Sequence, residues 1–116
     1  YINEIAPRVH NSGHHTIESC ATSQFEQHIR AITGLPLGET KMLVPAAVMI
    51  NILGERQAPA QVMGLEKALK IPSVSVHIYG KLETKFERKM GHITAIGKNH
   101  KEALRKAKLA RKYISI

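Results

Sequence analysis

The fold class is most clearly indicated by residues 73–110, SVSVHIYGKLETKFERKMGHITAIGKNHKEALRKAKLA. Its beginning, residues 73–79, alternates apolar and polar side chains, which is typical of a half-buried strand. A polar connection then leads to a second apolar segment, residues 89–96, which we expect to pair with the first. Asn99 precedes Glu102 at capping spacing, so a helix should follow. Two strands and a helix in this order predict an α+β domain.

The region upstream has the same mixed character. Residues 46–53 are apolar and β-rich, which predicts a buried strand. Pro59 suits the first turn of a helix. We expect that helix to carry Val62, Leu65 and Leu69 and to end before Pro72.

The chain opens with residues 1–5, which alternate in the manner of a strand. Ser23 and Glu26 then have capping-box spacing and predict the start of a helix, which Gly34 and Pro36 should end. A native chain seldom begins inside a strand, and residue 1 is not Met. We therefore expect this sequence to be a piece of a longer polypeptide.

Composition excludes several classes of protein. The 116 residues suffice for one modest core, and no apolar run is long enough to span a membrane. The single cysteine cannot form an internal disulfide, which favours a reducing, cytoplasmic compartment. Seventeen basic residues against nine acidic ones give a net charge of +8, which favours anionic partners.

The densest group of reactive side chains is NEIAPRVHNSGH, which begins at Asn3. Glu4 is a hard oxygen ligand suited to Mg²⁺, and the Asn3 carbonyl is a second candidate ligand. Arg8 offers a donor fork that matches carboxylate or phosphate oxygens. Asn11 and Ser12 are neutral donors suited to developing charge. A polar surface loop is the simpler alternative.

Three histidines in this region raise the question of a zinc site: His10, His14 and His15. Their spacing matches neither the helical pairs of zinc proteases nor a Cys/His finger, and Gly13 disfavours a helix there. The spacing therefore gives little support to a dedicated zinc site.

The sequence resembles the N5-carboxyaminoimidazole ribonucleotide synthetases, which are ATP-grasp enzymes of purine synthesis. The resemblance extends from residue 1 to about residue 97. It is carried by the runs NEIAPRVHNSGH (3–14), TIE (16–18), TSQFEQH (22–28), GLPLG (34–38), NILGE (51–55), HIYGK (77–81) and RKMGHI (88–93).

The resemblance implies a ligase that uses ATP to activate bicarbonate as carboxyphosphate and transfers the carboxyl group to the amine of 5-aminoimidazole ribonucleotide. It implies that Glu4 holds Mg²⁺ near the ATP phosphates, with Asn3 beside it. Arg8, His10 and Asn11 would act at the reaction centre, with Ser12 nearby in the substrate pocket.

The resemblance also implies that Lys81, Arg88 and Lys89 bind the phosphate of the ribonucleotide. The sequence leaves open whether Arg88 or Lys89 is the main ligand, because residues 82–87 depart from the usual family turn. Carboxyphosphate is short-lived in water, so the site has to exclude solvent and hold its reactants in contact.

By the same resemblance, residues 1–40 are the end of an ATP-grasp domain and residues 41–116 a small substrate-closing domain with a mixed sheet. The first metal-binding carboxylate, the glycine-rich lid and most of the ATP site of the family would precede residue 1. We therefore expect this polypeptide alone to be inactive as a ligase, and the full-length enzyme to be a homodimer.

Two alternatives remain open at this stage. A formate-using ATP-grasp transformylase shares the mechanism, although its equivalent loop matches residues 8–14 only in part. A small basic nucleic-acid-binding module would use the lysines and arginines of residues 98–112, but the chain has only five aromatic residues for base stacking. We expect neither a nucleic-acid nor a membrane partner.

Overall fold

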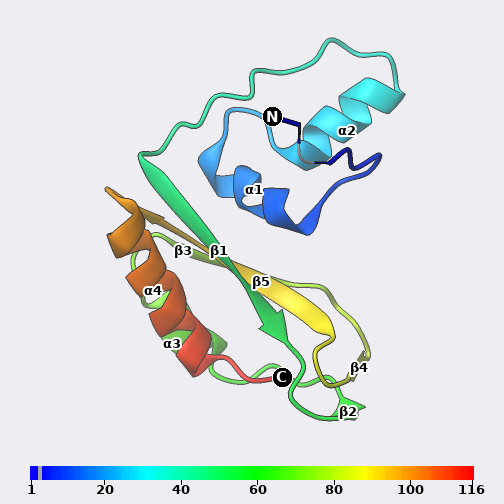
Figure 1. Ribbon diagram of the computed structural model, residues 1–116. Coiled ribbons are helices and arrows are strands. Elements are labelled where there is room, and N and C mark those ends of the chain that lie inside the picture. The colour runs from blue at the N-terminus through cyan, green and yellow to red at the C-terminus, as the bar shows by residue number, and fades with distance from the viewer. Residues whose placement is uncertain (3) are drawn as a thin grey trace. The chain divides into compact units, whose positions relative to one another are not determined.

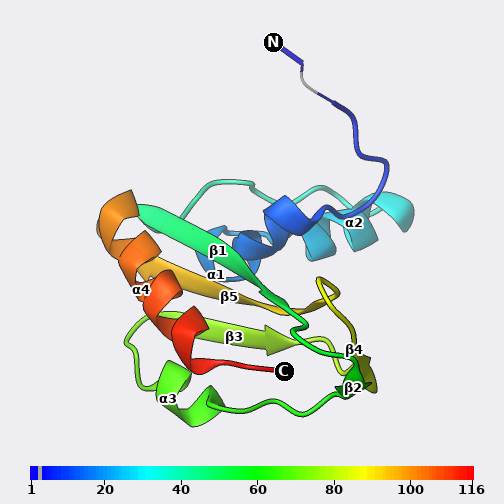
Figure 2. The same ribbon diagram turned by 60° about the horizontal axis from the view of Figure 1, so that its bottom comes forward.

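A three-stranded antiparallel sheet organises the second half of the chain. The computed structural model describes residues 1–2 and 4–116. Its strands β1 (Ala46–Leu53), β3 (Val74–Ile78) and β5 (Lys89–Gly97) lie in the order β1-β5-β3 (Figures 1 and 2). The strands predicted at residues 46–53, 73–79 and 89–96 are thereby confirmed.

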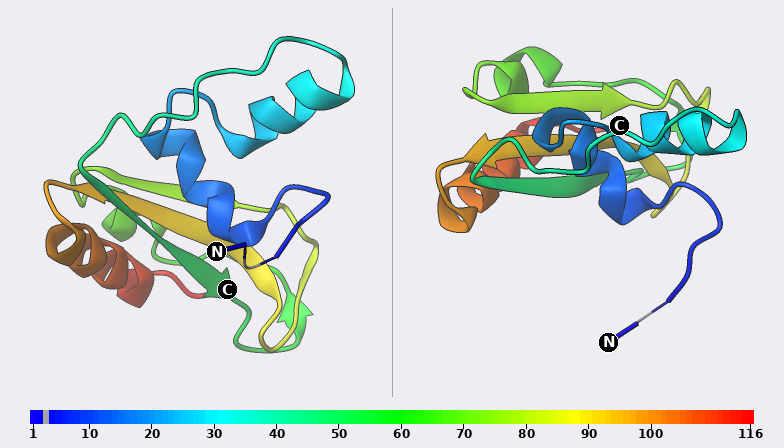
Figure 3. Two further views of the ribbon diagram at one scale, coloured as in Figure 1. Left: turned by 45° about the horizontal axis from the view of Figure 1, so that its top comes forward. Right: turned by 90° about the horizontal axis from the view of Figure 1, so that it is seen from above.

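Helix α4 (His100–Tyr113) packs against one face of this sheet (Figure 3). It meets the sheet through small side chains, and isoleucines of β1 and β5, Ile52 and Ile93, are fully buried in the core. Leu104 of α4 is only half-buried. The alanines of α4 that have no exposed surface are Ala103, Ala107 and Ala110. A narrow alanine stripe lets the helix approach the strands closely, and Leu104 lies beside it.

The start of α4 has the predicted cap. Asn99 accepts a hydrogen bond from the Glu102 amide at 2.9 Å, and Glu102 accepts one from the Lys98 amide at 3.0 Å. These contacts satisfy amides at a helix start that would otherwise lack partners. The hydrogen bond from the Lys98 amide, together with Lys106, also lowers the pKa of Glu102.

The helix expected from Pro59 begins later than predicted. Residues Ala58–Pro59 form a short strand, β2, which pairs with β4 (Glu83–Thr84), and the helix α3 covers only Leu65–Leu69. Gly64 immediately before α3 has a φ of +79°, a backbone conformation that favours glycine. Pairing with residues 82–84 keeps Pro59 extended, which overrides its preference for a first helical turn.

The N-terminal unit, Tyr1–Leu43, is compact in itself, and the second unit is Val44–Ile116. The first contains a 3-10 helix (η1, Asn11–His15) and two α-helices, α1 (Thr16–Ser19) and α2 (Gln24–Ile32). The predicted cap of α2 is confirmed, because Ser23 accepts a hydrogen bond from the Glu26 amide at 3.2 Å.

The strand predicted over residues 1–5 is not observed in the described part of that segment. Ile2 and Ile5 are 89% and 87% exposed, and among the described residues none pairs with them in a ladder. A strand is stable only with a partner strand to satisfy its amides and carbonyls. The alternation of apolar and polar residues was therefore insufficient to predict a strand in this segment. Asn3 lies outside the described residues.

Candidate functional site

Gln24, at the start of α2, holds the end of the NEIAPRVHNSGH segment through His10 and His14. Gln24 accepts a hydrogen bond from the His10 amide at 2.9 Å and donates one to the His10 carbonyl at 2.7 Å. The same amide group lies 2.7 Å from Nδ1 of His14. A Cβ at Gly13 would come within 2.6 Å of Gln24 Oε1, so the clamp requires glycine at that position. The loop is therefore fixed to the helix at His10.

His10 caps the 3-10 helix with its own side chain. The Ser12 amide donates a hydrogen bond to His10 Nδ1 at 3.2 Å, and the Ser12 hydroxyl lies 2.8 Å from the same atom. A backbone amide only donates, so Nδ1 is the acceptor and the ring proton of neutral His10 is on Nε2. The exposed ring consequently has an N–H donor for a ligand.

The other predicted residues of this unit have different settings. Arg8 is exposed and donates to the Val9 carbonyl at 3.0 Å, which leaves most of its donor fork to solvent. Glu4 is an exposed carboxylate, and Asn11 is half-buried within η1. The structure thus gathers His10, Asn11 and Ser12 on one turn, while Arg8 and Glu4 precede that turn.

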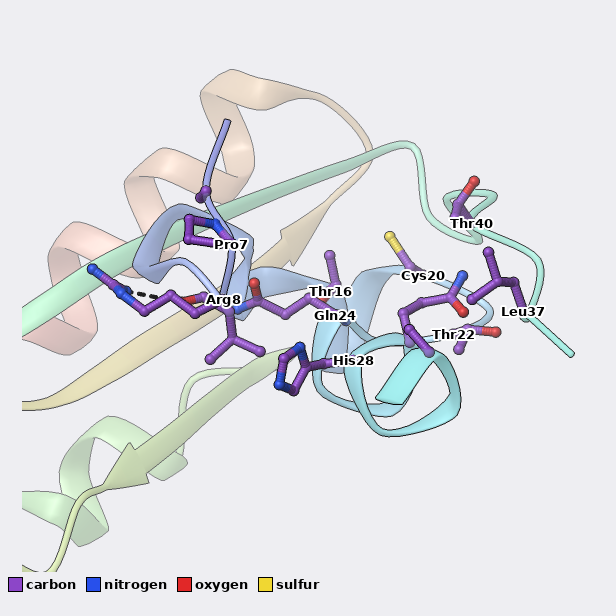
Figure 4. A pocket seen from close by; sticks show the side chains of 13 residues that line it. Pro7, Arg8, Thr16, Cys20, Thr22, Gln24, His28, Leu37 and Thr40 are labelled. Atoms are coloured by element: carbon purple, nitrogen blue, oxygen red, sulfur yellow. Dashed lines mark hydrogen bonds between the residues drawn. The ribbon is translucent and has the colours of Figure 1, made fainter. Parts of the chain in front are cut away.

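A hollow of about 600 Å³ lies within the first unit beside Arg8 (Figure 4). Pro7 and Arg8 border it on the side of the loop, and Leu37 and Thr40 on the opposite side. His28 of α2 lies between these two sides. The sequence did not predict this hollow, because its walls come from segments that are far apart in the chain.

The two other histidines of this region, His14 and His15, have separate partners. His14 packs against Phe25 with ring centroids 5.2 Å apart, in addition to its contact with Gln24. His15 Nδ1 lies 2.7 Å from the hydroxyl of Ser19, which is fully buried. His14 thus packs on α2 through Phe25, whereas His15 makes its contact with α1 through Ser19.

In the second unit, Lys81 is held at the beginning of the β3–β5 connection. Its ammonium donates to the Lys89 carbonyl at 2.6 Å and lies 5.8 Å from the centre of the Tyr79 ring. This brings the Lys81 side chain to the first residue of β5. The structure therefore places Lys81 beside the backbone of Lys89, another predicted phosphate ligand.

Arg88 is exposed at the other end of the connection and donates to the Glu83 carbonyl at 3.1 Å. Its own carbonyl accepts from the Gly54 amide at 2.8 Å. A Cβ at Gly54 would lie 2.2 Å from the Lys85 carbonyl, so the connection packs directly on this glycine. Both contacts fix residues 83–88 onto the end of β1.

Next to Lys81, the rings of Tyr79, His92 and His77 form a group that the sequence did not indicate as functional. His77 and His92 are directly opposite in the β3–β5 ladder and stack with centroids 4.4 Å apart. His92 is 2% exposed, and a hydrogen bond of 2.9 Å joins its Nδ1 to the Tyr79 hydroxyl. Burial raises the pKa of Tyr79, so its phenol stays protonated. The runs HIYGK and RKMGHI contain all these residues, but only strand register shows that they touch.

Two family profiles match the chain. The family described as "Phosphoribosylaminoimidazole carboxylase C-terminal domain" matches residues 47–106, more than half of the chain. The family described as "ATP-grasp domain" matches residues 1–25. The two matches fall in different structural units.

Individual relatives agree with these matches. The chain is 57% identical over 102 residues to a chloroplastic phosphoribosylaminoimidazole carboxylase of Vigna aconitifolia, covering 83% of this chain and 18% of that protein. The crystal structure of N5-carboxyaminoimidazole ribonucleotide synthetase from Thermotoga maritima has a TM-score of 0.91 and 56% identity, covering 97% of this chain and 32% of that one.

A second similar structure contains ligands. It is the N5-carboxyaminoimidazole synthase of Aspergillus clavatus in complex with ADP and 5-aminoimidazole ribonucleotide, with a TM-score of 0.74 and 39% identity. It covers 90% of this chain and 28% of that one. The chain thus spans a third or less of the length of these relatives. Within the part of the chain that the structure describes, no helix is long and apolar enough to cross a membrane.

Proposed function

The chain belongs to the phosphoribosylaminoimidazole carboxylase C-terminal domain family, and from this premise we propose that it is the C-terminal part of an ATP-dependent carboxylating ligase. The full-length protein would convert 5-aminoimidazole ribonucleotide, bicarbonate and ATP to N5-carboxyaminoimidazole ribonucleotide, ADP and phosphate. The observation that carries this proposal is the similarity to the Thermotoga maritima synthetase over 97% of the chain. The similarity includes both structural units.

In this proposal the first unit, residues 1–40 by our sequence prediction, ends the ATP-grasp domain and acts on the reacting groups. The guanidinium of Arg8 would offset the negative charge of bicarbonate and of the transferring phosphoryl group. The Nε2–H of His10, with Asn11 and Ser12, would donate hydrogen bonds to carboxylate or phosphate oxygens. The Gln24 clamp supports this role, since it fixes His10 by both its amide and its carbonyl.

The second unit, residues 41–116, would bind the ribonucleotide through its phosphate. Lys81, Arg88 and Lys89 are the candidate ligands, and the exposed Arg88 fork suits bidentate phosphate binding. We assign the main contact to Lys81 and Arg88, because the side chain of each is already held by a backbone carbonyl. Lys89 would be the lesser ligand.

ATP and Mg²⁺ are the cofactors of the proposed enzyme. Mg²⁺ in such sites is held by one or two carboxylates together with phosphates and water, and Glu4 is an exposed carboxylate of the required kind. Glu4 would hold the metal, which neutralises phosphate charge when bound, and Asn3 would lie next to it. One carboxylate is insufficient for a catalytic pair of ions, so we expect residues 1–116 alone to lack ligase activity.

The partners in this proposal are small molecules and a second copy of the full-length enzyme. We expect a cytoplasmic homodimer with neither a nucleic-acid nor a membrane partner. Size-exclusion chromatography with light scattering on the full-length protein tests the dimer.

The activity is tested by measuring ADP release from the full-length protein that contains this chain. We expect turnover that requires both bicarbonate and 5-aminoimidazole ribonucleotide, and formate in place of bicarbonate should support none. ATP hydrolysis that is indifferent to the ribonucleotide would refute the proposal. Turnover with formate and glycinamide ribonucleotide would assign the protein to the related transformylases.

A further inference from the structure

The ammonium of Lys81 has two neighbours that restrict where it lies. It donates to the Lys89 carbonyl at 2.6 Å, and it lies 5.8 Å from the centre of the Tyr79 ring. A cation within about 6 Å of an aromatic ring is attracted by the negative face of the ring. A free lysine side chain samples many rotamers, so these contacts reduce the conformational entropy that Lys81 loses on binding a phosphate.

The Tyr79 ring is itself held by His92. Its hydroxyl is joined to Nδ1 of His92 at 2.9 Å, and the two rings lie 5.7 Å apart. His92 is 2% exposed in the central strand β5, and it stacks on His77 at an interplanar angle of 14°. The series of contacts from Lys81 through Tyr79 to His92 therefore ends in β5, the central strand of the sheet.

We propose that Tyr79 is a positioning residue that, anchored by His92, holds the Lys81 ammonium in the place where it binds the phosphate of the ribonucleotide. Tyr79 acts through Lys81 and does not itself touch the substrate. The inference rests on the proposed function, because it needs Lys81 to be a phosphate ligand.

Two observations favour this role over simple packing. Packing alone requires only a ring at position 79, whereas the Tyr79 hydroxyl also makes a hydrogen bond of 2.9 Å with Nδ1 of the buried His92. Burial also raises the pKa of Tyr79, so the hydroxyl keeps its proton and can donate it to His92 Nδ1. A phenylalanine would keep the ring but would lose the anchor that sets its orientation.

The test is a double-mutant cycle in the full-length protein, with Tyr79→Phe, Lys81→Met and the double variant. Tyr79→Phe should raise the KM for the ribonucleotide about five-fold, which corresponds to about 1 kcal/mol, and should leave the KM for ATP unchanged. In the Lys81→Met background the same substitution should have no further effect on KM, since the ammonium it positions is gone. Tyr113→Phe, which removes a phenol at the end of α4, is the matched control and should change neither KM.

The outcomes are distinguishable. If Tyr79→Phe raises the ribonucleotide KM equally in both backgrounds, or leaves it unchanged, the positioning role is refuted while the proposed function stands. If Tyr79→Phe merely destabilises the fold, the melting temperature and kcat fall without a selective change in KM, which also refutes it. If Lys81→Met leaves the KM unchanged, the phosphate role of Lys81 and this inference fail together. Absence of ribonucleotide-dependent turnover in the wild type refutes the proposed function.

Discussion

Replacing Gln24 by alanine should release the NEIAPRVHNSGH loop from α2 without unfolding the helix. Gln24 Oε1 accepts from the His10 amide at 2.9 Å, and its Nε2 donates to the His10 carbonyl at 2.7 Å. Alanine removes both hydrogen bonds but is itself a good helix former, and Gln24 is the first residue of α2. The perturbation therefore acts on the loop.

Gln24→Ala also loses the contact with His14 Nδ1, but the magnitude at the His10 amide follows from the two hydrogen bonds to the His10 backbone. Each contributes about 1 kcal/mol net when its backbone partner regains access to water. A loss of about 2 kcal/mol raises the population of the open loop about thirty-fold. Because we propose that His10 donates a hydrogen bond at the reaction centre, kcat should fall together with loop order.

Amide hydrogen exchange in the full-length protein measures this directly. The His10 amide should exchange about thirty-fold faster in the Gln24→Ala variant. Gln27→Ala is the matched control, since Gln27 holds both the amide and the carbonyl of Gly38 at 2.8 and 2.6 Å. It should accelerate exchange at Gly38 and leave His10 unaffected. Unchanged exchange at His10 in Gln24→Ala would refute the clamp.

Three further predictions concern the second unit. Asn99→Ala removes the acceptor for the Glu102 amide and should cost about 1 kcal/mol of stability, measured as a lower urea midpoint with an unchanged slope. Gly54→Ala would place a Cβ 2.2 Å from the Lys85 carbonyl, so it should lower the melting temperature by several degrees, and an unchanged value would contradict that packing. The folded state lowers the pKa of Glu102, mainly through the hydrogen bond from the Lys98 amide, so the contribution of Glu102 to the free energy of unfolding is present above its unfolded pKa and is lost as the pH falls through the folded pKa. Glu102→Gln should therefore reduce the pH dependence of the free energy of unfolding in that acidic range. An equal pH dependence in both proteins would contradict this.

Local patterns predicted the second unit well and the first unit less well. The strands at residues 46–53, 73–79 and 89–96 and the cap at Asn99 were predictable because apolar runs, alternation and capping spacing are local signals that tertiary structure reinforced here. The strand at residues 1–5 was not, because a strand depends on a partner that its own sequence does not specify. Pro59 was misassigned because a two-residue pairing with β4 outweighs its local preference.

In the candidate site, too, local sequence signals predicted some residues and missed others. Motif content predicted His10, Lys81 and Arg88 as candidates for substrate binding, and their roles stay predictions. The residues that hold them, Gln24 and Tyr79, were missed because their contacts depend on distances across the fold. A clamp between residues 10 and 24 and a hydrogen bond between residues 79 and 92 leave no periodic signal in the sequence.

We propose that this chain completes an enzyme that attaches the carbon of bicarbonate to the amine of 5-aminoimidazole ribonucleotide. The most direct measurement is ¹³C NMR of the full-length protein with labelled bicarbonate, ATP, Mg²⁺ and the ribonucleotide. We expect a new carbamate carbon signal that forms in step with ADP and requires the ribonucleotide. ATP consumed with all label remaining in bicarbonate and carbon dioxide would contradict it.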